Sequence, residues 1–145
     1  MSLTMSQGER EAFLADVHVG IVSVDDPGHG PLSMPVWYTY EPGGTVDVLT
    51  GGQSRKARHM RAAGRFTLCV QTESVPYCYV SVEGPITLIR DTVSPEERRQ
   101  LAYRYLGPEL GDMYLAASPE DLSDSAVFRM SPERWLTADF AKQFG

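Results

Sequence analysis

Short runs of alternating apolar and polar residues recur along this 145-residue chain, separated by clusters of turn-forming residues. The runs are residues 18–24, 31–41, 45–49, 65–71, 78–90, and 126–130 with 134–138. Such alternation is typical of strands with one buried face. A chain of this length with so many strand-like runs predicts a mainly β, single domain over residues 1–145. Because closure of a sheet removes its exposed edges, we expect its core to be a closed or nearly closed barrel of about six antiparallel strands, with helices at the ends.

The turns between the runs suggest how the strands follow one another. Residues 25–30 predict a hairpin between the first two runs, and residues 42–44 turn the chain into the third, which together indicate a meander. Pro35 lies within the second run and cannot donate to a strand ladder. We therefore expect Pro35 at a sheet edge, at a bulge, or where something other than a strand approaches the backbone.

Capping signals mark the helices. Ser6 precedes Glu9 by three residues, which predicts a short helix over residues 6–16. Ser94 followed by proline and two glutamates predicts a helix over residues 98–106, stopped by the Gly-Pro pair at 107–108. A further short helix is expected at residues 119–122.

The chain has two lysines and eleven arginines, and one of the lysines lies in a glycine-rich basic turn at residues 50–61. This turn follows an alternating strand and begins a helix, so amide N–H groups and the positive end of the helix dipole lie on the same side as the cations. A bound anion is the natural occupant. The alternative interpretation is a solvated basic helix face.

Composition limits the partners. The net charge is −6, which argues against nucleic acid, since that binding depends on neutralising phosphates. The basic turn therefore suits a small anionic ligand. The sequence shows neither a secretory signal nor an apolar run of membrane-spanning length, so we expect a cytoplasmic protein that does not enter a membrane.

The cysteines and histidines do not form a recognisable site. Cys69 and Cys78 fall in neighbouring predicted strands and are expected to be buried free thiols. The three histidines, at positions 18, 29 and 59, lie on a strand start, a turn and a helix without metal spacing, so we expect no metal site. The acidic pair at 25–26 and Glu83 do not form a convincing general acid and base. No catalytic residue is assigned.

Residues 48–68 resemble the cofactor-phosphate segment of the pyridoxamine 5′-phosphate oxidase-like split β-barrel superfamily. The resemblance extends over roughly residues 9–137 and includes the Pro-Val-Trp-Tyr strand at 35–38 and the Val-Ser-Val-Glu-Gly run at 80–84. Within the segment, the shared features are a threonine that ends the strand, a Ser-x-Lys-x-Arg core, an apolar residue after an Arg-His pair and an Ala-Gly stretch before the next strand.

The resemblance implies a split β-barrel homodimer with flavin-type cofactors in grooves between the subunits. The cofactor is FMN or the deazaflavin coenzyme F420, and the chain is most similar to the flavin/deazaflavin-dependent oxidoreductase branch B. His59 replaces the asparagine that is usual in the family. The Arg-x-His pattern that true pyridoxamine phosphate oxidases carry near the C-terminus is absent, so that activity is not expected.

Carried over by position, the resemblance places the cofactor phosphate on Lys56 as a point charge. Guanidinium contacts from Arg55 or Arg58 and hydroxyl contacts from Ser54 and Thr50 would complete its binding. The residues expected beside the ring system are Met34, Pro35, Val36 and Trp37. An interrupted strand also exposes backbone groups that can bond the polar edge of such a ring, while Met and Trp cover its apolar face.

Two further expectations leave alternatives open. Trp37 would serve equally as an ordinary core residue. Tyr77 and Tyr79 follow Pro76 and, by the resemblance, could reach the partner's cofactor. Half-buried barrel tyrosines are the commoner case.

The leading hypothesis is an oxidoreductase that uses reduced F420 to transfer a hydride to a small unsaturated or carbonyl-containing molecule. The preference for arginine over lysine indicates GC-rich coding and favours F420 over FMN. The alternatives are an FMN-dependent oxidoreductase of the same fold, a non-catalytic protein that stores or senses the cofactor, and a dimeric interaction module whose basic turn holds only phosphate or sulfate.

Overall fold

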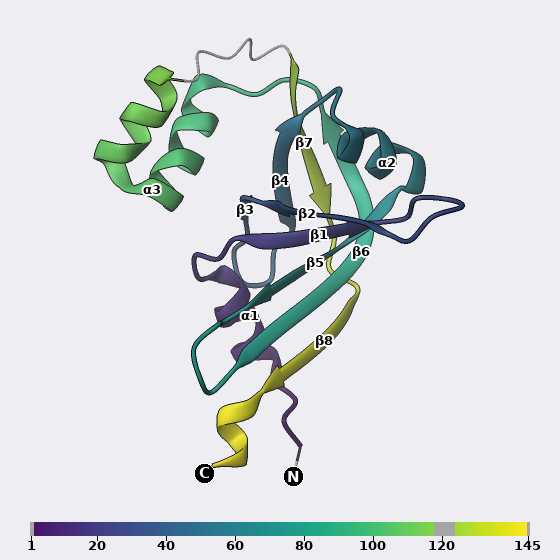
Figure 1. Ribbon diagram of the computed structural model, residues 1–145, viewed down its shortest axis with the longest axis vertical. Coiled ribbons are helices and arrows are strands. Elements are labelled where there is room, and N and C mark those ends of the chain that lie inside the picture. The colour runs from purple at the N-terminus through teal and green to yellow at the C-terminus, as the bar shows by residue number, and fades with distance from the viewer. Residues whose placement is uncertain (1, 118–123, 145) are drawn as a thin grey trace.

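A curled antiparallel sheet of eight strands forms the body of the protein in the computed structural model, which describes residues 2–117 and 124–144 (Figure 1). The strands are β1 (Gly20–Val24), β2 (Leu32–Val36), β3 (Tyr38–Thr39), β4 (Val46–Gly51), β5 (Arg65–Gln71), β6 (Cys78–Arg90), β7 (Ser125–Met130) and β8 (Arg134–Asp139). The helices are α1 (Gln7–Ala15), α2 (Arg55–Ala63), α3 (Pro95–Ala117) and the short 3-10 helix η2 (Phe140–Gln143).

The strand order explains how the sheet curls. Neighbouring strands follow the order β2-β1-β5-β6-β7-β4-β3. The eighth strand, β8, stands outside this order and pairs with β6. The long, bent strand β6 joins two parts of the sheet. Its first part pairs with β5 and β8, and its last part pairs with β7. The end strands β2 and β3 are separated in sequence by the single residue Trp37, so the two ends of the sheet come together there. The predicted nearly closed barrel is confirmed.

The predicted hairpin between the first two runs is confirmed by the pairing of β1 with β2, but the middle run of the predicted meander is not one continuous strand. The run at residues 31–41 divides at Trp37 into β2, which pairs with β1, and β3, which pairs with β4. This division, together with a strand pair at residues 125–139, raises the number of strands above the expected six. Pro35 lies on β2 at one end of the strand order, which is the first of the three placements predicted for it.

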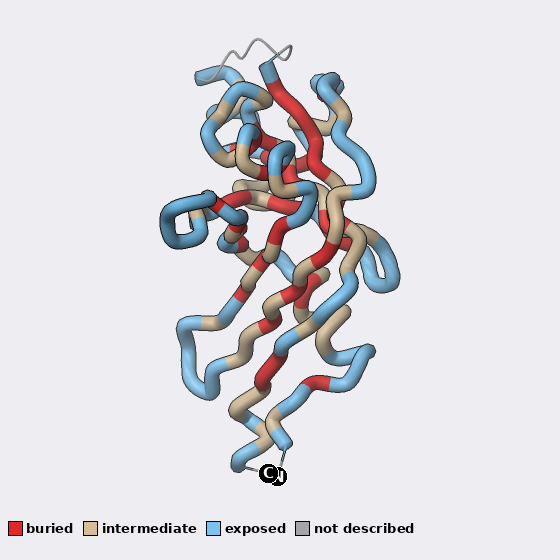
Figure 2. The backbone as a smooth tube through the Cα atoms, turned by 90° about the vertical axis from the view of Figure 1, so that its right-hand side faces the viewer, coloured by how far each residue is buried: buried red, intermediate tan, exposed pale blue. Residues whose placement is uncertain are grey.

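The core fills the inside of the curl. Inward-facing positions alternate along the strands as predicted, and Figure 2 shows buried residues concentrated on the strands while the loops are exposed. Helix α1 contributes the buried Leu14, and α2 contributes Ala57 and Met60. The largest fully buried side chains are Tyr38, Phe66, Phe128, Leu14, Met60, Leu68 and Met130.

The caps predicted at Ser6 and Ser94 form, and Ser94 and Glu97 bond each other reciprocally at the start of α3. The caps of α2 were not predicted. Ser6 and Glu9 make a reciprocal capping box at α1, and Ser54 caps α2 by accepting a hydrogen bond from the amide of Ala57. Gly64 ends α2 in the left-handed conformation, with φ of 71°. The predicted helix at residues 119–122 lies outside the described residues.

The regular helix over residues 98–106 is interrupted at residues 107–108, where a stop was predicted, but α3 has a second arm that was not predicted. Gly107 takes φ of 79° and ψ of 170°, which breaks the regular helix, but a second arm continues to Ala117. Proline is tolerated there because it begins the second arm, where its missing N–H is not needed. The two arms lie close together, since a Cβ at Gly111 would stand 2.6 Å from the ring of Tyr103.

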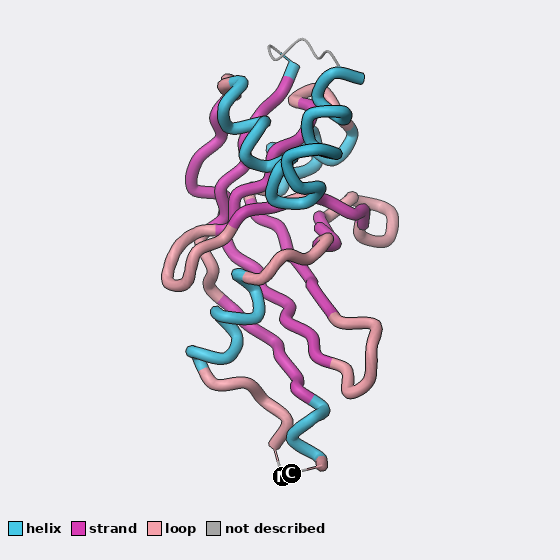
Figure 3. Tube along the Cα trace, turned by 90° about the vertical axis from the view of Figure 1, so that its left-hand side faces the viewer, coloured by secondary structure: helices cyan, strands magenta, loops and turns pink. Residues whose placement is uncertain are grey.

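The helices divide between the two ends of the sheet. Helices α2 and α3 gather near one end and α1 and η2 near the other, where the two termini also meet (Figure 3). Lys142 binds Glu9 across this junction at 2.8 Å. Both cysteines are free thiols, as expected, but each is only half-buried. Among the described residues, no helix has both the length and the apolar character needed to cross a membrane.

Candidate functional site

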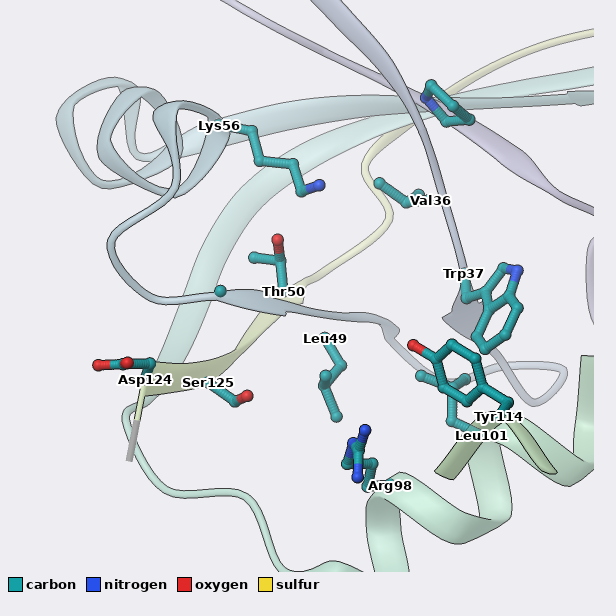
Figure 4. Close-up of a pocket in the computed structure, with 12 residues that line it drawn as sticks. Val36, Trp37, Leu49, Thr50, Lys56, Arg98, Leu101, Tyr114, Asp124 and Ser125 are labelled. Carbon is teal, nitrogen blue, oxygen red and sulfur yellow. The ribbon is translucent and has the colours of Figure 1, made fainter. Parts of the chain in front are cut away.

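A cavity of about 420 Å³ opens where the end of β4, the start of α2, the break between β2 and β3, and helix α3 converge. Lys56 and Arg98 reach toward it from opposite sides, one from α2 and the other from α3 (Figure 4). Its volume lies within the range of about 300–1,000 Å³ that is usual for small-molecule and cofactor sites. Five predicted site residues line it together: Thr50, Lys56, Pro35, Val36 and Trp37.

The basic side of the cavity is built by the β4 to α2 connection. Thr50 is the penultimate residue of β4 and is buried, with 7 % of its surface exposed. Lys56 lies in the first turn of α2, where the helix itself supplies no acceptor for the backbone N–H groups. The Lys56 ammonium group, the Thr50 hydroxyl group and the positive end of the α2 dipole therefore favour an anion at this side.

The aromatic side is built by the break between β2 and β3. Pro35, Val36 and Trp37 follow one another along the cavity wall. The Trp37 ring stacks on Tyr105 of α3, with centroids 4.9 Å apart and planes 4° apart. Tyr114 lies 5.5 Å from the Trp37 ring at 53°. The wall is thus an aromatic cluster held between the barrel and α3.

Tyr105 fixes this cluster to the barrel backbone. Its hydroxyl group accepts a hydrogen bond from the Tyr38 amide at 3.1 Å and donates to the His18 carbonyl at 2.6 Å. Burial raises the pKa of both Tyr38 and Tyr105, so each phenol keeps its proton at neutral pH. The Tyr38 hydroxyl donates to the Leu14 carbonyl at 2.7 Å. The hydrogen bonds therefore connect α1, β3 and α3 behind Trp37.

The contribution of α3 to the cavity was not predicted from the sequence. Arg98, Leu101 and Tyr114 line the cavity from this helix, and Ser125 and Asp124 line it from the start of β7. The helix over residues 98–106 was predicted, but capping signals locate a helix without saying what it faces. Tyr105 and Tyr114 were the available signal, because buried or half-buried tyrosines near other aromatic residues often form walls of this kind.

The remaining basic residues of α2 do not line the cavity. Arg55 is exposed and lies 3.4 Å from Asp26 of the β1 to β2 turn, and His59 approaches the same carboxylate at 3.4 Å. Asp26 is buried, so it ties α2 to this turn. Arg58 is exposed, and Ser54 acts as the helix cap. Their predicted contacts to a cofactor phosphate stay predictions.

Three other predicted residues also lie outside the cavity lining. Met34 alternates with Pro35 along β2 and packs against the core. Tyr77 and Tyr79 lie at the β5 to β6 hairpin and its following strand, beside a separate hollow. Tyr77 is 51 % exposed. In the part of the chain that the structure describes, no three His, Cys, Asp or Glu side chains converge as metal ligands do.

Solved structures share this fold. An F420 reductase is 20% identical, with 87% of this chain and 94% of that chain covered and a TM-score of 0.72. A conserved hypothetical protein from Mycobacterium tuberculosis is 22% identical, with 99% of this chain and 91% of that chain covered and a TM-score of 0.75. An FAD-binding protein from Mesorhizobium loti is 18% identical, with 92% of this chain and 94% of that chain covered and a TM-score of 0.62. No curated protein matches significantly in sequence.

The curled sheet is therefore a split barrel, the fold that these structures share. The family model for pyridoxamine 5′-phosphate oxidase matches residues 6–139, nearly the whole chain. The chain belongs to this family.

Proposed function

We propose that this protein is an oxidoreductase that binds reduced coenzyme F420 and reduces a small unsaturated or carbonyl-containing molecule. The observation that carries the proposal is the convergence of Lys56, Thr50 and Trp37 on one cavity, although they lie on separate elements. A cation and a hydroxyl group at one side and an aromatic wall at the other match a cofactor with a phosphate and a planar ring. Membership of the family supports the same class of ligand.

The phosphate end of the cofactor fits the start of α2. Lys56 supplies a compact positive charge, and the Thr50 hydroxyl group supplies a donor within the cavity lining. The first-turn amides of α2 add further donors. Arg55 is 64 % exposed at its side chain, which leaves it able to exchange Asp26 for an arriving phosphate.

The ring end of the cofactor fits the segment from Pro35 to Trp37. Pro35 and Val36 end β2, which pairs with β1 and lies at one end of the strand order, and Trp37 lies between β2 and β3. The backbone groups of the segment are therefore not committed to a full ladder on both sides. Trp37 gives the ring an aromatic edge whose position is set by Tyr105. The role of these residues is to orient the ring, because a displacement of about 1 Å can reduce the rate a hundredfold.

When bound, a reduced deazaflavin or flavin supplies the hydride, and the protein supplies orientation and exclusion of water. Val36, Leu49 and Leu101 give the cavity its apolar lining. An apolar wall strengthens the electrostatic contacts made by Lys56. A similar fold belongs to an F420 reductase, which supports the choice of F420.

A homodimer forms part of the proposal. The outer face of the sheet carries a row that crosses four strands, from Ile21 through Cys69 and Ser81 to Leu136. Ile21 is 41 % exposed and Leu136 is 64 % exposed, which makes this face a candidate for contact with a second copy. Sedimentation of Leu136→Glu tests it, with the exposed α3 residue Met113 changed to Glu as control. Loss of a dimer only in Leu136→Glu is expected, and a monomeric parent protein would overturn this part.

Cofactor titration tests the assignment of the basic side. Lys56→Ala is compared with Lys142→Ala, since Lys142 is the other lysine of the chain and binds Glu9 at the termini. Loss of the charge-assisted phosphate contact should weaken binding of F420 or FMN about tenfold or more. Lys142→Ala should bind as the parent does. Equal affinity of the Lys56 variant and the parent would remove the phosphate site from the proposal.

Turnover decides among the alternatives. Oxidation of reduced F420 only in the presence of a quinone, enone or tetrapyrrole acceptor is the result expected. Yellow protein that copurifies with FMN would reverse the choice of cofactor. Tight binding of F420 without turnover by any acceptor would favour a storage or sensing protein. Failure to bind either cofactor, with retention of sulfate, would favour an interaction module.

A further inference from the structure

Two tyrosines of α3 contact the Trp37 ring. Tyr105 stacks on it with planes 4° apart. Tyr114 also contacts it, with centroids 5.5 Å apart and planes at 53°, and Figure 4 shows the two rings side by side at the cavity. We infer that Tyr114 is a gate residue, which blocks Trp37 and has to rotate away before a planar ring can stack there. The inference rests on the proposed function, because it concerns how a flavin-type ring reaches the aromatic side of the cavity.

The distance between the Trp37 and Tyr114 rings leaves no room for a ligand between them. Carbon atoms in contact lie about 3.5–4.0 Å apart, so a flat ring between two aromatic faces needs those faces about 7 Å apart. The two centroids are only 5.5 Å apart. The face of Trp37 that stacks on Tyr105 is covered as well. A planar ring therefore stacks on Trp37 only when one of the two tyrosines moves.

Tyr105 is held too firmly to be the residue that moves. Its hydroxyl group accepts a hydrogen bond from the Tyr38 amide at 3.1 Å and donates to the His18 carbonyl at 2.6 Å. Rotation of this side chain would break both hydrogen bonds in a part-buried place and leave their partners unsatisfied. Tyr105 therefore stays against Trp37 as the fixed side of the aromatic wall.

Tyr114 has only weak contacts to lose. It is 37 % exposed, and Figure 4 shows its hydroxyl group pointing into the cavity. Among the described residues this hydroxyl group has no hydrogen-bond partner. Besides Trp37, its ring faces the Arg98 guanidinium group at 5.9 Å, close to the limit of about 6 Å for a cation–π contact. Rotation of Tyr114 therefore breaks aromatic contacts but no hydrogen bond.

The backbone of α3 does not have to move with this side chain. Glu97 in the first turn of α3 binds Arg90 through two hydrogen bonds of 3.0 and 2.7 Å, which join the first arm to β6. The second arm, which carries Tyr114, lies against the first at Gly111, whose Cβ position is 2.6 Å from the Tyr103 ring. The gate is therefore one side chain on a fixed helical hairpin.

A gate of this kind lowers the apparent affinity for planar ligands. The ligand competes with Tyr114 for Trp37, so only the fraction of molecules with Tyr114 rotated away can bind it, and the apparent dissociation constant rises by the inverse of that fraction. One aromatic contact changes such an equilibrium about two- to tenfold. Tyr114→Ala should therefore bind the cofactor more tightly by this factor, although it removes an aromatic ring from the cavity lining.

Stopped-flow titration with F420 and FMN in turn measures the gate in the intact protein. Tyr114→Ala should raise the association rate constant about two- to tenfold and leave the dissociation rate constant unchanged, because Tyr114 acts only before the ring has bound. Tyr114→Phe keeps the ring and should behave as the parent does. The matched control is Met113→Ala, since Met113 is 62 % exposed and lies outside the lining. Slower or weaker binding by Tyr114→Ala, or binding equal to the parent's, would overturn the gate.

Quenching of tryptophan fluorescence by acrylamide tests the cover of Trp37 without any cofactor. Trp37 and Trp135 are the two tryptophans of the chain, so Trp135→Phe leaves Trp37 as the single reporter. In this background Tyr114→Ala should raise the quenching constant, and Met113→Ala should not. Unchanged quenching in Tyr114→Ala would overturn the inference. Circular dichroism shows whether each variant folds, and the stopped-flow measurement, which needs no tryptophan variant, decides the question if Trp135→Phe does not.

The two proposals fail separately. If a cofactor binds in a Lys56-dependent way and Tyr114→Ala binds it no faster than the parent, the gate is wrong and the proposed function stands. If neither cofactor binds to the parent or to Tyr114→Ala, the proposed function is overturned. Quenching that rises in Tyr114→Ala alone would then still support Tyr114 as the cover of Trp37.

Discussion

Trp37 and Tyr105 stack face to face, with ring centroids 4.9 Å apart and planes 4° apart. Trp37 lies at the break in the barrel and lines the cavity, and Tyr105 lies on α3 behind it, so this contact fixes the aromatic wall of the cavity against α3. The Tyr105 hydroxyl group fixes its own ring by accepting from the Tyr38 amide and donating to the His18 carbonyl. The position of Trp37 therefore depends on a residue outside the cavity lining.

Tyr105→Phe keeps the stack and removes these hydrogen bonds. We expect the free energy of unfolding to fall by about 1–3 kcal/mol, since the Tyr38 amide loses its partner in a part-buried place. Tyr105→Leu should lose about 0.5–1.5 kcal/mol more, because the aromatic contact also goes. Urea unfolding measures both. Tyr103→Phe is the control, since its exposed bond to Asp112 should matter little.

The role of the buried hydroxyl group would be contradicted if Tyr105→Phe lowered the free energy of unfolding no more than Tyr103→Phe does. The stack would then be the whole of the interaction. In that case Tyr105→Leu alone should lower the stability of the protein.

The parts of the fold that sequence predicts are those governed by near neighbours. Ser6 with Glu9 and Ser94 with Glu97 mark the starts of α1 and α3 through local caps, and both pairs are recognisable in the sequence. The alternation that predicts β5 reflects a period of two along one strand. The placement of Lys56 at the start of a helix after a strand follows from the same local signals. About half of the candidate site was therefore predictable.

The rest depends on contacts between distant segments. The run at residues 31–41 looks continuous, but β2 and β3 pair with different strands, and only the curl of the sheet decides where the break at Trp37 falls. The kink at Gly107 was predicted as an end, since local signals for a helix stop and for a helical hairpin are the same. Tyr114 returns to the cavity only through that kink, and Arg98 lines the cavity because the first arm of α3 lies beside it. Periodicity alone could not place them there.

Asp26 offers a test of how α2 is held. Its carboxylate lies 3.4 Å from Arg55 and 3.4 Å from His59, and the residue is buried. Asp26→Asn should lower the free energy of unfolding by about 1 kcal/mol, because both partners lose the charge they face and Arg55 is largely solvated. Cofactor affinity should also fall a few-fold, since Lys56 shares the first turn of α2 with Arg55.

The neighbouring Asp25 is exposed and supplies the control for that change. Asp25→Asn should leave both unfolding and cofactor titration unaltered. If the two variants behave alike, the tie between the β1 to β2 turn and α2 does not position Lys56.

Gly84 tests how closely the two halves of the barrel cross. A Cβ there would stand 1.8 Å from the backbone oxygen of Ser131, and backbone cannot move aside as a flexible side chain can. Gly84→Ala should therefore destabilise the protein by more than about 3 kcal/mol or prevent folding. Gly30→Ala is the control, because no atom lies within 4 Å of its Cβ position. Soluble yield and urea midpoints measure both, and matching midpoints would show that β6 and the β7 to β8 turn separate easily.

Glu9 should make the stability of the protein depend on pH between 4.5 and about 2. Hydrogen bonds from Lys142 and from the Ser6 backbone lower the pKa of Glu9 from its ordinary 4.5 to about 2. The native state therefore holds this carboxylate ionised where the unfolded chain protonates it. Its contribution is present above pH 4.5 and is lost as the pH falls toward about 2.

Glu9→Gln removes that dependence and keeps a side chain of similar size. The variant should unfold at a lower temperature than the parent at neutral pH, and the gap should close as the pH falls from about 4.5 to about 2. Thermal unfolding across this range measures it, with the exposed hairpin residue Glu73 changed to Gln as control. If the difference in unfolding temperature stays constant down to a pH of about 2, Glu9 stabilises α1 through its shape and neutral hydrogen bonds. A gap that closes only in the Glu9 variant assigns the effect to the ionised carboxylate that joins α1 to Lys142.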